Sequence, residues 1–288
     1  GNHKLNFVKE LKKLTNGIGI MLSFNNLGNF GRIGNQMFQY ASLKGIAKNH
    51  GYDFCIPPRE VFGVFDKSVK NDKANIYDLF SLEDTNNIQI TSNKVLKEKV
   101  FHFDQDLFDN CDDDVDFLGY YQTEKYFNHI KDEILSDFTF KDEILLDCKS
   151  FYNEHFINDK VISLHIRRGD YITNSNHPVQ SIDYYENALS NFSNDIPVLI
   201  FSDDPKWCEN QKLFESDRFF ISHGGDPIAD LCIMTLCDYH IIANSSYSWW
   251  GAWLSQSEKV IAPSEWFGGE LKKTKDTKDI YCDNWEII

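Results

Sequence analysis

The sequence lacks the signals that mark several large classes of protein. No apolar run among its 288 residues approaches the ~20 residues of a membrane-spanning helix, and no secretory signal peptide is recognisable. Seven cysteines are scattered along the chain, without a Cys-x-x-Cys pair or a cysteine–histidine cluster at zinc spacing. We therefore expect reduced cysteines and a cytoplasmic location, or one at the periphery of the inner membrane.

Acidic residues outnumber basic ones, with 44 Asp and Glu against 29 Lys and Arg. The formal net charge is −15 at pH 7, which argues against a nucleic-acid partner and against adhesion to an anionic membrane through bulk charge. An anionic ligand would have to be met by a local group of basic residues. Because arginine is rare in this chain, Arg32, Arg167 and Arg168 stand out as candidates.

The N-terminal part begins with a βαβ pattern. Hydrophobic residues make up 42% of the chain and aromatic residues 15%, so a substantial core can form. The pattern predicts a strand at 19–24, a helix at 35–50 and a second strand at 52–56. Residues 60–114 show weak periodicity and indicate an insertion of loops and short strands. Further elements are expected as a strand at 116–120 and helices at 126–135 and 141–155.

The C-terminal part alternates regularly between strands and helices. Strands are expected at 161–167, 197–202, 218–221, 239–243 and 259–262. Helices are expected at 182–192, 205–214, 226–237 and 247–256. This repetition predicts a second parallel sheet, followed from residue 266 by a short polar tail. We expect two domains, at 17–157 and 158–288.

The most informative segment is His165–Tyr171, which follows a short apolar strand. Strand alternation should point Arg167 and Arg168 in opposite directions. One can pair with a carboxylate such as Asp170, and the other can face the carboxyl edge of the sheet, where α/β proteins bind ligands. A planar guanidinium suits a phosphate or diphosphate. A plain ion-pair network at the strand end is the alternative, and His165 could either contact a base or lie in the core.

A glycine-rich turn, Gly31–Gln36, joins the first strand to its helix. Backbone N–H groups and the positive end of the helix can meet an anion there. Gly34 permits close backbone approach, and Asn35 offers both a donor and an acceptor. The turn is neither a Gly-x-Gly-x-x-Gly motif nor a P-loop. An ordinary turn with Asn35 as the helix cap is equally consistent with the sequence.

Two adjacent carboxylates, Asp203 and Asp204, end a strand ahead of Pro205. They could cap the next helix, bind a divalent metal, or line a nucleotide or sugar pocket. Their adjacent spacing, rather than Asp-x-Asp, weakens the metal interpretation. We favour capping for one and pocket lining for the other.

Asn244, Ser245 and Ser246 mark the start of a late helix. Hydroxyl and N–H groups at that terminus would form a second anion site. The tryptophans that follow are expected to serve helix packing rather than sugar stacking, and they are Trp249, Trp250 and Trp253.

Three motifs together resemble those of one enzyme family. They are, in chain order, GRIGNQMFQYA, HIRRGDY and NSSYSWWGAWL. In this order they resemble the α-1,2-fucosyltransferases of glycosyltransferase family 11, and the resemblance runs from about Gly19 to Trp266.

The resemblance implies a GT-B fold, in which two Rossmann-like domains face a cleft. The C-terminal domain would hold GDP-fucose and the N-terminal domain a glycan acceptor. The implied reaction inverts the anomeric centre of L-fucose without a metal or other cofactor. Its expected acceptor is the 2-hydroxyl of a β-galactoside.

The resemblance also implies roles for particular residues. Arg167 corresponds to the essential ligand of the donor phosphates, and Asn35 lies near the diphosphate, so both are expected to be catalytic. His165 and Asp230 correspond to guanine contacts. The expected donor-binding set is Gly34, Asn35, His165, Arg167, Arg168, Asp170, Asp203, Asp204, Asp230, Asn244, Ser245 and Ser246.

Several alternatives stay open on the sequence alone. The acceptor could be a different glycan. A metal-dependent glycosyltransferase could use Asp203 and Asp204, or the acidic run Asp112–Asp114. A non-catalytic protein that binds a nucleotide sugar or a glycan could share the same fold. The sequence identifies neither the general base nor the oligomeric state.

Overall fold

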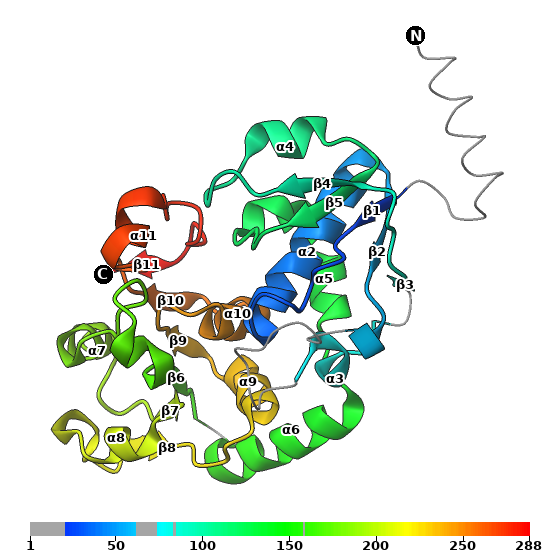
Figure 1. Cartoon of the computed structure of the whole chain (residues 1–288). Helices are drawn as coiled ribbons and strands as arrows, with labels where there is room; N and C mark the ends of the chain where they lie inside the picture. The colour runs from blue at the N-terminus through cyan, green and yellow to red at the C-terminus, as the bar shows by residue number, and fades with distance from the viewer. Residues whose placement is uncertain (1–20, 62–73, 83–84, 158) are drawn as a thin grey trace. The chain divides into compact units, whose positions relative to one another are not determined.

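The chain folds into two compact α/β units (Figure 1). The structure, a computed structural model, describes residues 21–61, 74–82, 85–157 and 159–288. The first unit comprises the described residues up to Tyr77 together with Leu82–Asp137, and the second comprises Asp78–Ser81 and Phe138–Ile288. Each unit contains one sheet whose strands pair in parallel, which confirms the predicted α/β class.

The first sheet has five strands in the order β3-β2-β1-β5-β4. They are β1 (Met21–Ser23), β2 (Asp53–Ile56), β3 (Asn86–Asn87), β4 (Lys94–Lys97) and β5 (Val115–Leu118). The chain moves outward from β1 to β3, continues at the opposite edge with β4 and then enters β5 beside β1. The two sides of the sheet therefore meet between β1 and β5, a position at which open α/β sheets bind ligands. Residues 19 and 20 of the first predicted strand lie outside the described residues.

Helix α2 (Ile33–His50) connects β1 to β2 and completes the predicted βαβ unit (Figure 1). It begins at Ile33 rather than at the predicted Asn35, because the buried Ile33 already packs into the core. Gly51 ends the helix at φ +67°, as predicted for a C-terminal glycine. A Cβ atom on Gly45 would lie 1.9 Å from the carbonyl oxygen of Tyr126, so the helix crossing requires glycine there.

The predicted helix at 126–135 is wrong in its extent. The segment contains two short 3₁₀ turns, η2 (Glu124–Tyr126) and η3 (Asn128–Ile130), followed by helix α5 (Lys131–Asp137). Phe127 interrupts the helix at φ −135° because its buried ring packs against Phe38, with ring centroids 6.4 Å apart. A tertiary contact thus overrides the local helical pattern.

The inserted region, 60–114, contains the predicted short strands β3 and β4. It also contains short helices that were not predicted, because each has too few residues for a periodic pattern. They are η1 (Arg59–Val61), α3 (Ile76–Leu79) and α4 (Gln105–Asn110). The acidic run Asp112–Asp114 lies in the connection between α4 and β5, where Asp114 pairs with Lys94 at 3.4 Å.

The second sheet has six strands in the order β11-β10-β9-β6-β7-β8. They are β6 (Ile162–Ile166), β7 (Val198–Ser202), β8 (Phe219–Ile221), β9 (Tyr239–Ile241), β10 (Lys259–Ala262) and β11 (Glu286–Ile287). All strands but β11 were predicted, each within a few residues. This is the strand order of the Rossmann fold, and its reversal lies between β6 and β9.

The helices of the second unit largely follow the predicted positions. They are α6 (Asp142–Phe156), η4 (Gly169–Thr173), α7 (Ile182–Leu189), α8 (Pro205–Glu209), η5 (Lys212–Phe214), α9 (Pro227–Leu236), α10 (Ser246–Ser255) and α11 (Gly269–Thr274). The predicted helix at 205–214 is divided into α8 and η5. The tail was predicted only as short and polar, and in the structure it forms α11 and supplies the sixth strand, β11, beside β10.

The compact units divide between Asp137 and Phe138, whereas the predicted domains meet at 157/158. Helix α6 belongs to the second unit because it packs on α9, where the Cys148 thiol lies 3.7 Å from the Ala229 carbonyl oxygen. Phe138 likewise packs its ring edge-on against Trp250, with centroids 5.2 Å apart. All seven cysteines are buried as thiols.

Candidate functional site

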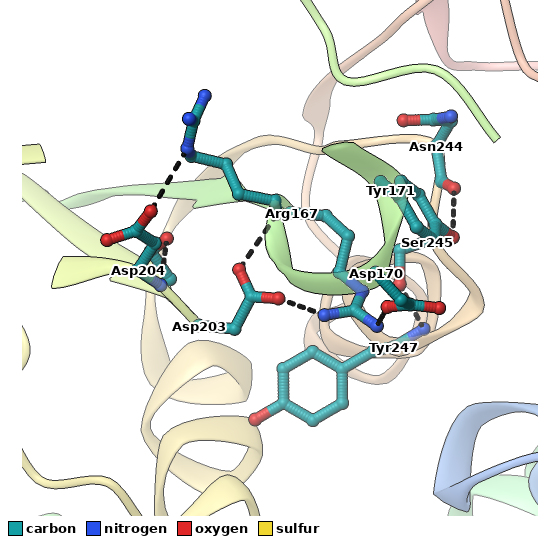
Figure 2. Close-up of polar contacts among 10 residues, drawn as sticks. Arg167, Asp170, Tyr171, Asp203, Asp204, Asn244, Ser245 and Tyr247 are labelled. Atoms are coloured by element: carbon teal, nitrogen blue, oxygen red, sulfur yellow. Dashed lines mark hydrogen bonds and ion pairs between the residues drawn. The ribbon is translucent and has the colours of Figure 1, made fainter. Parts of the chain in front are cut away.

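Polar and charged residues gather at the carboxyl edge of the second sheet (Figure 2). Strand β7 ends directly before Asp203, and its neighbour β6 ends directly before Arg167. On the other side of β6, strand β9 ends a few residues before Asn244. Parallel strands bring their carboxyl ends to one edge, so loops far apart in sequence meet there. The sequence-predicted residues of the C-terminal part are therefore brought together by topology.

The guanidinium of Arg167 is held between two carboxylates (Figure 2). Its Nη1 donates to Asp203 and its Nη2 to Asp170. Its Cζ atom also lies 4.8 Å from the ring centroid of Tyr171. The Arg167 side chain is only 14% exposed. Water can therefore hydrate the guanidinium only weakly, and hydration cannot take the place of the two carboxylates. The sequence left open which arginine pairs with a carboxylate such as Asp170, and in the structure it is Arg167. Asp203 is a partner that the local sequence does not reveal.

Gly169 makes this double pairing sterically possible. A Cβ atom at this position would lie 2.5 Å from Oδ2 of Asp203 and 2.9 Å from Nη1 of Arg167. Its φ of +22° is also rarely adopted by other residues. Any larger side chain would separate the guanidinium from its carboxylate.

Arg168 points away from Arg167, as strand alternation predicts. Its Cζ atom lies 4.1 Å from the ring centroid of Trp207, and its Nε donates to Oδ2 of Asp204 at 3.2 Å. Asp204 also accepts from the Trp207 N–H at 3.1 Å, which confirms the prediction that one of the adjacent carboxylates caps the following helix. Trp207 was not predicted, because only the folded chain places it against Arg168.

Two guanidinium groups therefore face three carboxylates in this cluster. Asp203 is 28% exposed and also accepts from the Arg168 backbone N–H at 2.8 Å, so it is fixed from two sides. Asp170 is 63% exposed and is the more easily displaced partner of Arg167. An incoming anion can therefore reach the Arg167 fork by taking the place of Asp170.

The N-terminus of helix α10 borders the same edge. Ser245 caps it by accepting from the Tyr247 N–H at 3.3 Å, as the predicted helix start requires. The Asn244 amide instead holds two loops, since its Nδ2 donates to the carbonyls of Pro178 at 3.0 Å and Trp266 at 3.1 Å. Ser246 is the first residue of the helix. The predicted tryptophan packing is confirmed, because all three rings are buried.

His165 is a core side chain in this structure. It is 4% exposed, and its Nδ1 lies 2.7 Å from the Ser248 hydroxyl, which fixes strand β6 to helix α10. Burial, reinforced by the nearby positive charge of Arg167, lowers the pKa of His165 to about 3. The imidazole is therefore neutral at physiological pH, and its role as a base contact stays a prediction.

Asp230 lies on helix α9 beside the end of β8. It accepts from the Ser222 hydroxyl at 2.9 Å. Burial raises the pKa of Asp230 to about 6, although the hydrogen bond from Ser222 opposes that shift. A half-buried carboxylate with acceptor capacity suits a planar group that presents two N–H donors. Ser222 was not predicted, since it lies in a loop without a recognisable motif.

The remaining predicted residues, Gly34 and Asn35, lie in the first unit. They occupy the first turn of α2, after β1. Oδ1 of Asn35 accepts from Nε2 of Gln122, which follows β5, at 2.8 Å. Gln122 was not predicted, because nothing in its local sequence connects it with a residue 87 positions away.

Among the residues that the structure describes, no group of three or more His, Cys, Asp or Glu side chains could hold a metal ion.

The helices in the described ranges are each too short or too polar to cross a membrane.

Comparison with known proteins connects this arrangement to glycosyl transfer. The model of glycosyl transferase family 11 matches residues 6–288. An α-1,2-colitosyltransferase from Escherichia coli is 32% identical over 267 residues, which cover 83% of this chain and 91% of that protein. The O-antigen biosynthesis glycosyltransferase WbnK of Escherichia coli is 36% identical over 184 residues, and the match spans 58% of this chain and 59% of that protein. Galactoside α-(1,2)-fucosyltransferase 2 of Rattus norvegicus is 26% identical, over 85% of this chain and 70% of that protein.

Solved structures share the fold. The fucosyltransferase NodZ from Bradyrhizobium superposes with a TM-score of 0.57 at 13% identity, covering 88% of this chain and 97% of that one. NodZ α-1,6-fucosyltransferase soaked with GDP-fucose gives 0.56 at 13% identity, covering 86% and 96%. At this identity the likeness extends to the fold alone, and it confirms the predicted GT-B class with two Rossmann-like units.

Inorganic pyrophosphate can test whether a bound anion takes the place of the Asp170 carboxylate at Arg167. We expect Asp170→Asn to bind pyrophosphate about 2–5-fold more tightly than the wild type, because an ion pair of this exposure is worth under about 1 kcal/mol. Isothermal titration calorimetry in a metal-free buffer measures the difference. Asp183→Asn, on the exposed surface of α7, changes the net charge equally and should leave the affinity unchanged. Weaker binding by Asp170→Asn would show that Asp170 does not compete with the anion.

Proposed function

This chain belongs to glycosyl transferase family 11, and on that premise we propose that it transfers L-fucose from GDP-β-L-fucose to a hydroxyl group of a glycan. The proposed acceptor is the 2-hydroxyl of a β-galactoside, and the product is an α-1,2-linked fucoside. One observation carries the proposal. The Arg167 fork lies at the strand-order reversal of a Rossmann sheet, with an exposed and replaceable carboxylate on one side.

The donor's diphosphate is the chemical group that this edge accommodates best. A guanidinium offers two parallel N–H donors to phosphate oxygens, and the adjacent N-terminus of α10 adds backbone N–H groups and a partial positive charge. Asp230 can accept from the ring N–H and the amino group of guanine. These contacts would orient GDP along the carboxyl edge of the second sheet.

In the proposed reaction the acceptor oxygen attacks the anomeric carbon of fucose as its bond to the diphosphate oxygen breaks. Positive charge develops on the sugar ring, as in glycosidase chemistry, while negative charge grows on the departing GDP. Arg167 would stabilise that charge, and one such preorganised donor contributes about 2.7–4 kcal/mol, or ~10²–10³ in rate. We also propose a catalytic role for the Asn35 amide. The acceptor proton passes to a base as the new bond forms.

A related donor is the second candidate. The Escherichia coli α-1,2-colitosyltransferase is 32% identical over nearly its whole length. Colitose is L-fucose without the 3-hydroxyl, so the same diphosphate and guanine contacts would serve both donors. Only the surroundings of that hydroxyl would discriminate between them.

A panel of donors and acceptors tests the function directly. We expect transfer from GDP-fucose to lactose or another β-galactoside, with the product identified by mass spectrometry and linkage analysis. Turnover should persist in EDTA, because the nearby carboxylates already bind arginine. Transfer from GDP-colitose at a much higher kcat/KM would favour the second candidate. Loss of turnover in EDTA, with recovery on added Mg²⁺ or Mn²⁺, would contradict the metal-independent mechanism.

The Arg167→Lys variant distinguishes the effect of the positive charge at this position from the effect of the guanidinium's paired N–H donors. Lysine keeps the positive charge but loses the fork, so we expect kcat to fall by about 10²–10³-fold while the thermal unfolding midpoint stays near that of the wild type. Arg168→Lys is the matched variant on the opposite face, where the guanidinium stacks on Trp207. We expect it to affect stability more than kcat. Wild-type turnover by folded Arg167→Lys would remove the basis of the proposal.

Asp230 should give GDP binding a characteristic pH dependence. Because the pKa of Asp230 is raised to about 6, its carboxylate carries charge above pH 6 and is protonated below it. Only the charged form accepts from both guanine donors, so GDP affinity should fall as the pH drops from 7 to 5. Calorimetric titration at several pH values measures this. Asp230→Asn should bind GDP weakly and lose the pH dependence in this range; an unchanged profile would show that another group titrates.

A further inference from the structure

The hydroxyl of Ser222 is bonded to the Asp230 carboxylate within the second unit. Its Oγ donates to Oδ1 of Asp230 at 2.9 Å. Ser222 is itself fixed, because its backbone N–H donates to the Ile200 carbonyl at 2.8 Å and continues the pairing of β8 with β7. Asp230 is fixed on the helix side, since its backbone N–H donates to the Asp226 carbonyl at 3.0 Å at the start of α9. The hydrogen bond therefore joins a strand end to a helix across the loop between them.

The second carboxylate oxygen of Asp230 has a different environment. No residue that the structure describes donates a hydrogen bond to Oδ2. The neighbouring loop has no side chain at Gly224, where a Cβ atom would lie 3.9 Å from Oδ1 of Asp230 and 4.0 Å from Oγ of Ser222. The next residue, Gly225, has a φ of +64°, which other residues rarely adopt. The loop thus passes close to the hydrogen bond with little side-chain volume, and Oδ2 keeps its capacity to accept from a ligand.

The Ser222–Asp230 pair belongs to the same unit as the Arg167 cluster. The first turn of α9 is tied to the N-terminus of α10, because the Tyr247 hydroxyl donates to the Pro227 carbonyl at 2.5 Å. The Tyr247 ring also lies 5.4 Å from the ring of His165, two residues before Arg167. Helices α9 and α10 and the end of β6 are therefore fixed to one another, so a diphosphate site and a base site there are held by one unit.

We propose that Ser222 is a positioning residue that holds the Asp230 carboxylate in the orientation that guanine requires. The proposal rests on the proposed function, in which Asp230 accepts from the ring N–H and the amino group of GDP. Each carboxylate oxygen has two lone pairs, so Oδ1 can accept from Ser222 and from the base, while Oδ2 accepts from the second donor of guanine. Without the hydroxyl, the carboxylate is free to rotate about its Cβ–Cγ bond, and its oxygens lose their alignment with the two donors.

Ser222 also favours the charged form of Asp230. Burial raises the pKa of Asp230 to about 6, while the Ser222 hydrogen bond acts against that shift and the charge of Asp226 adds to it. Cys148 of α6 is also close and stays a neutral thiol, because burial raises its own pKa. A hydrogen bond to a charged group is worth roughly tenfold or more in an equilibrium constant, so its loss should raise the pKa of Asp230 by about 1.

Calorimetric titrations at several pH values, with GDP and with IDP, test the proposal. IDP keeps the ring N–H but lacks the amino group. We expect Ser222→Ala to weaken GDP binding about 3–10-fold at pH 7, and to move the midpoint of the pH dependence about one pH unit upward. The preference for GDP over IDP should fall about 3-fold or more, because a misaligned carboxylate no longer meets both donors. In the Asp230→Ala background, Ser222→Ala should have no further effect.

Two variants are matched controls. Ser222→Thr keeps the hydroxyl and should restore the affinity, the midpoint and the preference of the wild type. Ser190→Ala removes an exposed hydroxyl that donates to the Asn187 carbonyl at the end of α7, and should leave GDP binding unchanged. His223, beside Ser222, pairs with Glu209 at 3.1 Å and is present in every variant, so its titration cannot produce a difference between them.

The outcomes separate this proposal from the function on which it rests. If the wild type does not bind GDP, the proposed function fails and this inference fails with it. If the wild type binds GDP but folded Ser222→Ala keeps its affinity, midpoint and preference, only this inference is overturned. Equal weakening of GDP and IDP with an unmoved midpoint also overturns it, because Ser222 would then support the loop rather than the carboxylate. Should thermal unfolding show that Ser222→Ala does not fold, Ser222→Cys takes its place, since a thiol fills the same space and donates only weakly.

Discussion

The pairing of Arg167 with carboxylates is the interaction on which the rest of the second unit's edge depends. A nearly buried guanidinium without a partner would cost several kcal/mol, so the fold must supply anions at the end of β6. Asp203 comes from the neighbouring strand, Asp170 from the turn that follows, and Gly169 leaves room for both. In the proposed function an incoming diphosphate would replace one of these anions with another. The Arg167 guanidinium is therefore not buried without an anion, and its ion pair with Asp170 can still open.

Much of this edge could be predicted, because its main residues lie in continuous segments. The arginine pair, the capping role of Asp204 and the helix start at Ser245 follow from strand alternation and helix capping. Their partners could not be predicted in the same way. Trp207 and Gln122 meet their targets only after β-strands far apart in sequence become neighbours. Local patterns carry no information on such contacts.

The same limit explains the errors in the fold. Strand β11 has only two paired residues, which is too few to show alternation, yet it completes the second sheet because β10 leaves an edge open. The expected helix at 126–135 fails because the ring of Phe127 gains more by packing against α2 than by continuing a helix. Helix α6 joins the second unit through side-chain packing on α9, which no loop composition marks. In each case tertiary contacts decided between locally acceptable alternatives.

The distribution of charge supports a mechanism in which the protein itself neutralises the leaving group. Two of the carboxylates that the sequence offered as metal ligands are engaged elsewhere: Asp203 binds Arg167 and the Arg168 backbone, and Asp204 binds Arg168 and caps α8. A divalent cation would have to separate them from these partners, and the freed guanidinium groups would then repel it. With the overall charge at −15, an anionic donor gains little from the surface at large. In the proposed function its binding would come from a few oriented donors.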